Sequence, residues 1–156
     1  LLKPLTSMNI SIKKFDDLTV PELYKILNLR NEVFVVEQNC PYLDTDGKDE
    51  VANHVMVWQD EVLVAYARIF TPGIKYATSS IGRVVVNPTY RELKLGHLLM
   101  EHAVKAVEDL YKTGIITLSA QAHLQRFYNK HGFETVSEEY MEDDIPHVEM
   151  IRTKEL

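Results

Sequence analysis

The chain has 156 residues, of which 46% are hydrophobic and 26% are charged. The length fits one domain, and the composition excludes disorder of the whole chain, because enough apolar surface is present to offset the entropy lost on folding. With 17 basic against 23 acidic side chains, the formal net charge is −6, the wrong sign for a protein that mainly binds nucleic acid. No apolar run is long enough to span a bilayer, and the single cysteine, Cys40, has no partner for an internal disulfide. We therefore expect a cytoplasmic protein with no nucleic-acid or membrane partner.

The first strand-like pattern of the chain begins only after Met8. We interpret residues 1–7 as a leftover of cloning outside the fold, and we expect one domain over residues 8–156. No internal repeat, low-complexity tract or Pro/Ser-rich linker divides that domain.

Helix and strand patterns alternate along the domain. Thr19 and Glu22 are spaced as a capping box around Pro21, which predicts a helix over residues 21–36. Two β-rich stretches, 54–59 and 62–70, are separated by Asp60 and Glu61 and predict an antiparallel hairpin. The remaining predicted elements are strand 80–86, a long helix over 95–110, strand 115–120, a helix over 122–131 that Gly132 ends, and strands 133–140 and 147–152. This order predicts a single α/β domain of the α+β kind.

The stretch from Val84 to Leu99 passes from a β-rich run directly into the long helix. A helix start leaves backbone N–H groups unpaired and carries the positive end of the helix dipole, so an anion such as a pyrophosphate binds there readily. Gly96 would let a phosphate approach the backbone, and Arg91 and Lys94 would add positive charge.

The same residues also allow a purely structural interpretation. Thr89 and Glu92 have the spacing of a capping box, which would leave Arg91 and Lys94 on a solvated face and Gly96 packed against a neighbouring strand. The local spacing does not decide between the two interpretations.

Together with a second stretch, Ser119–Phe133, this segment resembles the acetyl-CoA signature of the GNAT N-acetyltransferase superfamily. That signature reads Gln/Arg-x-x-Gly-x-Gly/Ala and continues in a later helix that ends in Tyr-x-x-x-Gly-Phe. Arg91 and Gly96 stand on its first and last motif positions, while Lys94 replaces the middle glycine. The chain is similar to the ElaA-type branch in five segments: Leu29–Gln38, Ala65–Ile69, Ile81–Val86, Ala120–Leu124 and Ile145–His147.

The resemblance implies a GNAT-type domain, with a twisted, mostly antiparallel mixed sheet and helices on both faces. It implies acetyl-CoA as cosubstrate and no metal. The strand before the signature would splay from its neighbour and lend backbone groups to the pantetheine arm, and the signature itself would hold the pyrophosphate. The expected cofactor contacts are Val84, Val85, Val86, Arg91, Glu92, Leu93, Lys94, Leu95, Gly96, His97, Gln121 and Phe127.

Tyr128 matches the family tyrosine that protonates the departing CoA thiolate, a role that suits a phenol. Without the resemblance, the simpler interpretation is an aromatic residue at a helix end that packs on Phe127 and Phe133.

Acetyl transfer also needs a group that deprotonates the amine. Many relatives carry a glutamate on the strand before the phosphate loop, but residues 80–86 contain no carboxylate. The candidates for the base are Glu37, His54 and His147, and for each of them a structural hydrogen bond is the simpler explanation.

Two further sets of charged residues have alternative explanations. Arg68 lies in the middle of a predicted strand and needs a partner there, so we expect it to pair with Glu37 or to hold substrate. The acidic segment near the C-terminus could attract a cationic amine or could form a solvated loop; its members are Glu138, Glu139, Glu142, Asp143 and Asp144.

Other chemistries fit the sequence poorly. Asp44-x-Asp46-Gly47 is similar to the start of a calcium loop, but the glycine is two positions early and the closing glutamate is absent. His97 and His102 are five residues apart, which aligns them poorly for a shared metal. There is no Gly-x-Ser-x-Gly elbow, and Cys40 is interpreted as a small packed residue rather than a nucleophile.

The sequence therefore predicts an N-acetyltransferase that moves an acetyl group from acetyl-CoA to a primary amine by direct attack, with Tyr128 as general acid. The alternative is a non-catalytic CoA-binding or protein-interaction module of the same fold. Pairing into a homodimer stays open, because no interface is legible in the sequence.

Overall fold

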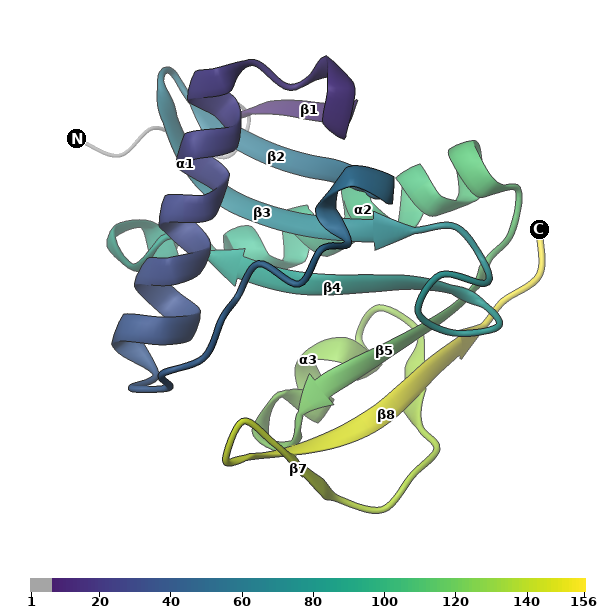
Figure 1. Cartoon of the computed structure of the whole chain (residues 1–156). Coiled ribbons are helices and arrows are strands. Elements are labelled where there is room, and N and C mark those ends of the chain that lie inside the picture. The colour runs from purple at the N-terminus through teal and green to yellow at the C-terminus, as the bar shows by residue number, and fades with distance from the viewer. Residues whose placement is uncertain (1–6) are drawn as a thin grey trace.

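The computed structural model describes residues 7–156 of the chain (Figure 1). Of residues 1–7, interpreted above as a leftover of cloning, all but Ser7 lie outside the described residues. The strands are β1 (Asn9–Lys14), β2 (Asn53–Gln59), β3 (Val62–Phe70), β4 (Ser79–Val86), β5 (Ile115–Gln121), β6 (Phe133–Thr135), β7 (Tyr140–Glu142) and β8 (Ile145–Thr153). The helices are α1 (Val20–Arg30), α2 (Leu95–Tyr111) and α3 (Gln125–Asn129).

The strands form one sheet in the order β1-β2-β3-β4-β5-β8-β6, with β7 paired to β8. Within the described chain, β4 and β5 are parallel and the other pairs are antiparallel. Helix α1 crosses one face of the sheet and α2 the opposite face (Figure 1). The structure thus confirms the predicted α+β domain with a mostly antiparallel mixed sheet and helices on both faces.

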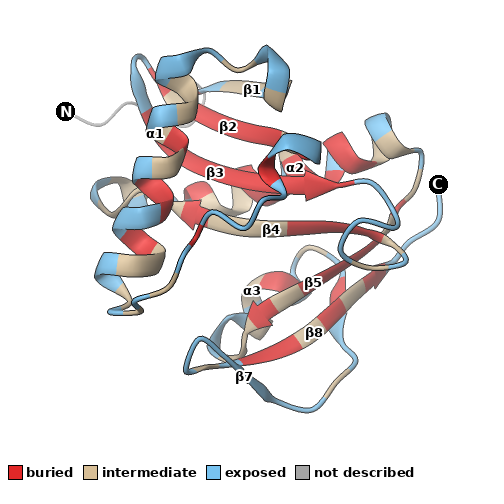
Figure 2. Ribbon diagram, viewed as in Figure 1, coloured by how far each residue is buried: buried red, intermediate tan, exposed pale blue. Residues whose placement is uncertain are grey.

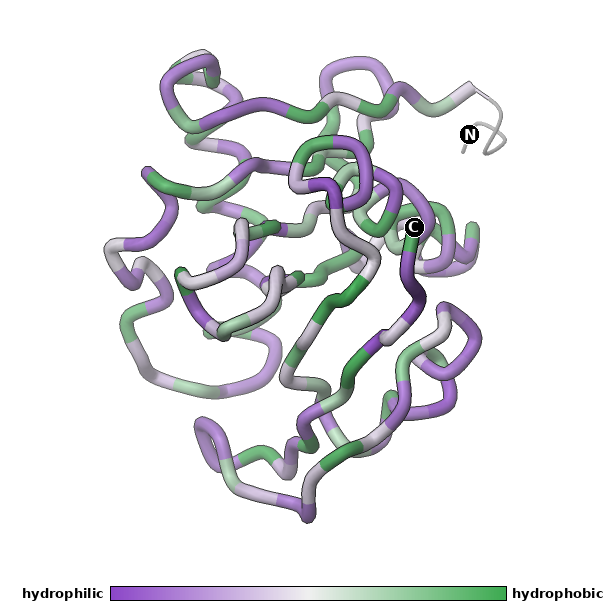
Figure 3. The backbone as a smooth tube through the Cα atoms, turned by 90° about the vertical axis from the view of Figure 1, so that its right-hand side faces the viewer, coloured by the Kyte–Doolittle hydropathy of each residue, from purple (hydrophilic) through white to green (hydrophobic). Residues whose placement is uncertain are grey.

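The sheet separates two apolar layers. On β2, Val55 and Val57 belong to the layer under α2, whereas Met56 between them belongs to the layer under α1, as the two-residue period of a strand requires. Buried positions therefore run along the central strands (Figure 2), and hydrophilic residues predominate in the peripheral loops (Figure 3). The residues of α2 that face the larger layer recur every three or four positions: Leu95, Leu99, Met100, Ala103, Ala106 and Val107.

The first predicted helix is only partly α-helical. Helix α1 has the predicted capping box at Thr19 and Glu22, but it ends at Arg30 and continues as a wider π-helical segment, Asn31–Glu37. Beyond it, the amide of Gln38 donates to the carbonyl of Val33, five residues back. The valine-rich run in this segment favours departure from the α-helix, because β-branched side chains crowd the preceding turn.

The predicted strand 133–140 is wrong, because residues 136–139 interrupt it and leave the two short strands β6 and β7. The Ser137 hydroxyl accepts a hydrogen bond from the amide of Glu149 at 2.8 Å, so a side chain takes the place of a strand partner here. The predicted helix over 122–131 is shorter than expected, a 3-10 turn at Ala122–Leu124 followed by α3. Helix α3 ends at Asn129, three residues before the predicted stop at Gly132, whose φ is +88°.

A buried ionic network ties residues 38–52 to the core. Arg30 is fully buried at the end of α1; its Nε donates to Asp44 Oδ2 at 2.7 Å and its Nη1 to Asp49 Oδ1 at 2.6 Å. Burial by itself raises the pKa of Asp49, but the hydrogen bonds from Arg30 and Arg68 outweigh it and hold that pKa below the usual range. The Asp44 carboxylate also accepts a hydrogen bond from Tyr42.

The predicted pairing of Arg68 with Glu37 is wrong. Arg68, 1% exposed on β3, instead donates to Asp46 at 2.7 and 2.8 Å and to Asp49 at 2.9 Å. The aspartates that were compared with a calcium loop are therefore the counterions of arginines. Arg83 of β4 completes the network, with its Nε 2.9 Å from Asp44 Oδ1.

We expect Arg30→Met to lower the free energy of unfolding by about 3–5 kcal/mol, because Asp44 and Asp49 would stay buried without this cation. Urea denaturation followed by circular dichroism measures the loss. The control is Lys105→Met, which breaks an exposed pair with Asp109 and should leave stability unchanged. Equal stabilities for the two variants would contradict the role given to the network.

Candidate active site

Strands β4 and β5 pair only at their beginnings. Ser79 pairs with Ile116 and Ser80 with Thr117, and beyond those residues the two strands diverge (Figure 1). The later part of β4 therefore presents backbone N–H and C=O groups that β5 does not use. Such an edge can accept an extended chain that carries amides.

A β-bulge bends β4 at the same place. Tyr66 pairs with Val85 and Arg68 with Gly82, so Arg83 and Val84 together face the single residue between those two. Arg83 has φ of +49°, in the left-handed region. The bulge directs the Arg83 side chain toward Asp44 and places Val84 on the wall of a pocket.

The turn after β4 brings a helix start to the open edge. Residues Pro88–Leu93 form a 3-10 turn whose first amide, that of Thr89, is capped by the Asn87 side chain. The capping-box interpretation of Thr89 and Glu92 is therefore wrong. Helix α2 begins at Leu95, and no side chain caps its start. The amide of His97 donates to the carbonyl of Lys94, and uncapped amides at a helix start favour an anion.

Lys94 stands where the family signature has its middle glycine. Its φ and ψ of +53° and +36° are left-handed, a conformation that glycine adopts without strain. The lysine thus has a backbone conformation that suits glycine, and it adds a positive charge at the start of the helix.

Gly96 makes room for an aromatic ring. A Cβ at this position would lie 3.1 Å from Cε1 of Phe127 on α3. The Phe127 ring also packs on His97, at 4.8 Å between centroids, and His97 Nδ1 lies 2.9 Å from Nε2 of His131. Gly96 therefore packs closely, as the structural interpretation held, mainly against Phe127 of α3 and also near Val86 of β4, whose Cγ2 lies 4.0 Å from the same Cβ position. His97 contacts His131, and the two together join α3 to the start of α2.

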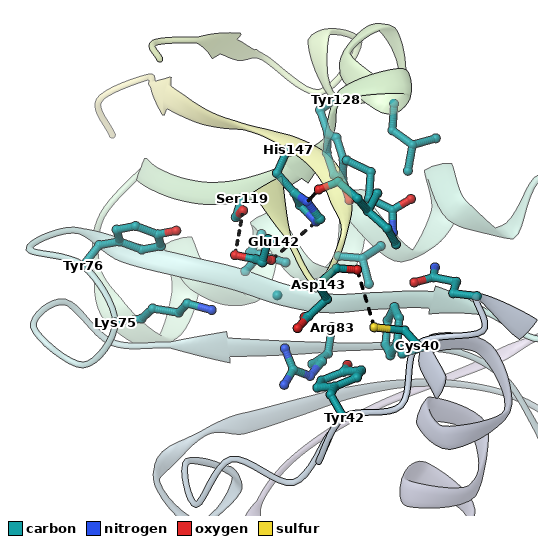
Figure 4. Close-up of a pocket in the computed structure, with 18 residues that line it drawn as sticks. Cys40, Tyr42, Lys75, Tyr76, Arg83, Ser119, Tyr128, Glu142, Asp143 and His147 are labelled. Atoms are coloured by element: carbon teal, nitrogen blue, oxygen red, sulfur yellow. Dashed lines mark hydrogen bonds and ion pairs between the residues drawn. The ribbon is translucent and has the colours of Figure 1, made fainter. Parts of the chain in front are cut away.

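A pocket opens beside the diverging strands (Figure 4). Four residues predicted for the site line it: Val84, Gln121, Tyr128 and His147. Most of the other lining residues were not predicted from the sequence to belong to the site, among them Phe34, Gln38, Tyr42, Lys75, Tyr76, Arg83 and Ser119. Of the acidic segment, Glu142 and Asp143 reach the pocket wall.

Tyr128 is 6% exposed and packs edge-on against Phe127 and Phe133, with ring centroids 5.0 and 6.2 Å away. The packing expected from the sequence is therefore present, and the residue also lines the pocket. Burial raises the pKa of its phenol, so the hydroxyl stays protonated and can donate.

His147 is held by its Nδ1, which lies 2.7 Å from the carbonyl oxygen of Ile145. A carbonyl can only accept, so Nδ1 carries the proton and the neutral ring has its lone pair on Nε2. That atom lies 3.4 Å from Glu142 Oε2. Ser119 Oγ contacts Tyr140 Oη at 2.5 Å and Glu142 Oε1 at 3.4 Å, which orients this wall of the pocket.

Residues 29–154 match the model of the acetyltransferase (GNAT) domain family. The chain belongs to the GNAT acetyltransferases. It is 44% identical to the ElaA protein of Escherichia coli over 138 residues, which cover 87% of this chain and 90% of that protein. The crystal structure of Escherichia coli ElaA superposes with a TM-score of 0.87 at 41% identity, covering 93% of this chain and 99% of that one. The crystal structure of an acyl-CoA N-acyltransferase from Pseudomonas aeruginosa has a TM-score of 0.88 at 48% identity, with the same coverage. The predicted membership of the ElaA-type branch is confirmed.

In this GNAT acetyltransferase, two of the three base candidates have other partners. Glu37 does not line the pocket; it forms a two-pronged ion pair with Arg91 at 2.6 and 2.9 Å, and Arg91 lowers the pKa of its carboxyl. His54 is fully buried; its Nε2 donates to the carbonyl of Asp49 and its Nδ1 accepts from Tyr66 Oη at 2.6 Å. Burial lowers the pKa of His54.

Cys40 lines the pocket of this acetyltransferase, but its surroundings do not favour a thiolate. Burial, and the negative charges of Asp143 and Asp144, raise the pKa of the thiol.

In residues 7–156, no helix is both long enough and apolar enough to cross a membrane.

Proposed function

We propose that this acetyltransferase moves an acetyl group from acetyl-CoA to a primary amine by direct attack of the amine. One observation carries the proposal: the Tyr128 phenol and the His147 imidazole line the same pocket, beside the open edge of β4. A donor for the leaving thiolate and an acceptor for the amine proton are the two groups that this reaction requires.

The chain's features also suit acetyl-CoA. The backbone of Val84–Val86, which pairs with β3 but not with β5, suits the amides of a pantetheine arm on its open side, and the uncapped start of α2 suits a pyrophosphate. Lys94 adds charge at that start, and Arg91, held by Glu37, lies on the preceding turn. Gln121 ends β5 on the other side of the opening.

The reaction follows from these positions. The lone pair of the neutral amine forms the bond to the acetyl carbonyl carbon, and His147 Nε2 takes a proton from the nitrogen as positive charge develops there. The carbon–sulfur bond breaks, and Tyr128 Oη donates its proton to the departing thiolate. Solvent returns the proton from His147 to Tyr128, so the products are the acetamide and free CoA. Glu142, beside Nε2, stabilises the imidazolium formed on the way.

The phosphate loop can be tested with two lysines that share a backbone conformation. Lys94 and Lys112 flank opposite ends of α2, and both have a left-handed backbone, with φ of +53° and +57°. Lys94→Gly and Lys112→Gly therefore remove the same charge and the same side chain from the same backbone conformation. Their stabilities should agree within about 1 kcal/mol. Only Lys94→Gly should weaken acetyl-CoA binding, about tenfold and with a smaller salt dependence, measured by calorimetry at two ionic strengths. Equal weakening in both variants would contradict the assignment.

Tyr128→Phe tests the acid. The ring packing on Phe127 and Phe133 is kept, so stability and acetyl-CoA affinity should be unchanged. We expect kcat to fall about 10²–10⁴-fold, measured as CoA release with a panel of amines. Wild-type protein that binds acetyl-CoA but acetylates no amine would favour the non-catalytic module instead.

The two buried histidines form a matched pair that tests the base. His147→Gln should lower kcat about 10²–10⁴-fold. His54→Gln should leave kcat unchanged but lower the free energy of unfolding by about 1–3 kcal/mol, because Tyr66 and the Asp49 carbonyl lose their partner. Steady-state kinetics and urea denaturation on both variants separate the two outcomes. The opposite pattern would move the base to His54.

A further inference from the structure

The pocket has walls of opposite charge. Lys75, from the β3–β4 loop, and Arg83, from the bulge of β4, extend into it from one side (Figure 4). Glu142 and Asp143, together with His147, line the other side. Lys75, Glu142 and Asp143 come from a loop, a strand end and a turn, whereas Arg83 lies within β4 itself.

The positive wall has more charge than its own counterions balance. Arg30, Arg68 and Arg83 share Asp44, Asp46 and Asp49, so that network is neutral by itself. Lys75 is an additional cation, and no carboxylate of the described residues lies within ion-pair distance of its Nζ. The contacts of Arg83 use Nε and Nη2, and within residues 7–156 its Nη1 makes no hydrogen bond.

The ammonium of Lys75 is poorly compensated where it lies. Lys75 is exposed, but desolvation by the surrounding protein, followed by the charge of Arg83, lowers its pKa, and Glu142 opposes this shift. An anion placed between Lys75 and Arg83 would relieve this repulsion. A carboxylate, with its two oxygens, suits an Arg N–H edge and a lysine ammonium together.

The negative wall is rigid. Glu142 pairs with Ile145 across a two-residue turn formed by Asp143 and Asp144, whose φ angles of +52° and +61° are those of a tight hairpin turn. This turn holds Glu142 beside Nε2 of His147, where the reacting amine must lie if His147 is the base.

We propose that the acceptor is an amino acid: Lys75 and Arg83 bind its carboxylate, while Glu142 and His147 receive its amine. The proposal rests on the acetyl transfer proposed above and specifies its substrate class. The reaction is the same, in that the amino nitrogen forms the bond to the acetyl carbon, the thiolate leaves with the proton of Tyr128, and His147 takes the amine proton. The product is an N-acetylated amino acid, which keeps its carboxylate on the positive wall.

The test uses matched acceptors with wild-type protein. A panel contains the twenty protein L-amino acids, the carboxamide of each, two ω-amino acids (β-alanine and γ-aminobutyrate) and the diamine putrescine; CoA release and product mass are measured. The amine of a carboxamide loses its proton more easily than the amine of the free amino acid, so intrinsic reactivity favours the carboxamide. A preference of the enzyme for the free acid therefore has to come from recognition of its carboxylate by the protein. We expect at least one free amino acid to exceed its carboxamide about tenfold or more in kcat/KM.

Variants of the positive wall complete the test. Lys75→Gln should lower kcat/KM for the preferred acid about tenfold and leave that for its carboxamide unchanged, and Lys75→Glu should reverse the preference between them. Lys130→Gln, which removes an exposed lysine after α3, should change neither value.

The remaining outcomes are distinct from one another. If carboxamides or putrescine are acetylated as well as the acids, or if Lys75→Gln affects both members of a pair equally, the acceptor class is wrong while the proposed acetyl transfer stands. If wild-type protein acetylates no amine of the panel, the proposed transfer to a small amine fails, and this inference fails with it.

Discussion

Three arginines, two of them buried, and three aspartates hold the site together. The long connection from α1 to β2 carries little regular structure, so the ionic contacts of Asp44, Asp46 and Asp49 fix its path over the sheet. Such a network contributes little net stability compared with an apolar core, but the loss of Arg30 or Arg68 leaves the buried carboxylate of Asp49 with one cation fewer. The network therefore fixes where the connection runs, and with it the position of Tyr42 and Cys40 on the pocket wall.

Strand β4 supports both halves of the site. Its first residues are held between β3 and β5, its bulge turns Arg83 toward the ionic network, and its end leads into the turn before α2. Two features of this one strand are therefore related. The divergence from β5 opens a backbone edge, and the bulge directs the side chain of Arg83 to the positively charged wall of the pocket. Phe127, packed at Gly96, connects this framework to α3 and so to Tyr128.

Patterns between near neighbours in the sequence predicted most of the fold. The β2–β3 hairpin and α2 follow from periodicity and turn residues, and the family resemblance drew attention to the segment before α2 and to Tyr128. The partners of Arg68 and Glu37 could not be predicted, because they depend on where residues 38–52 and the turn after β4 return to the sheet. The break at residues 136–139 depends on a contact between Ser137 and Glu149 across strands. Lys75 belongs to no motif, and only the folded loop brings it to the pocket.

The two walls of the pocket differ in how freely they can change during evolution. The Asp143–Asp144 turn is as short as a hairpin connection usually gets, and insertions there would shift the register of β7 and β8. The β3–β4 loop, by contrast, is mostly exposed around Pro72 and Gly73, and lengthening it disturbs neither the sheet nor the start of α2. Homologous enzymes could therefore diverge in acceptor choice through this one loop while their binding of the acyl donor stays the same.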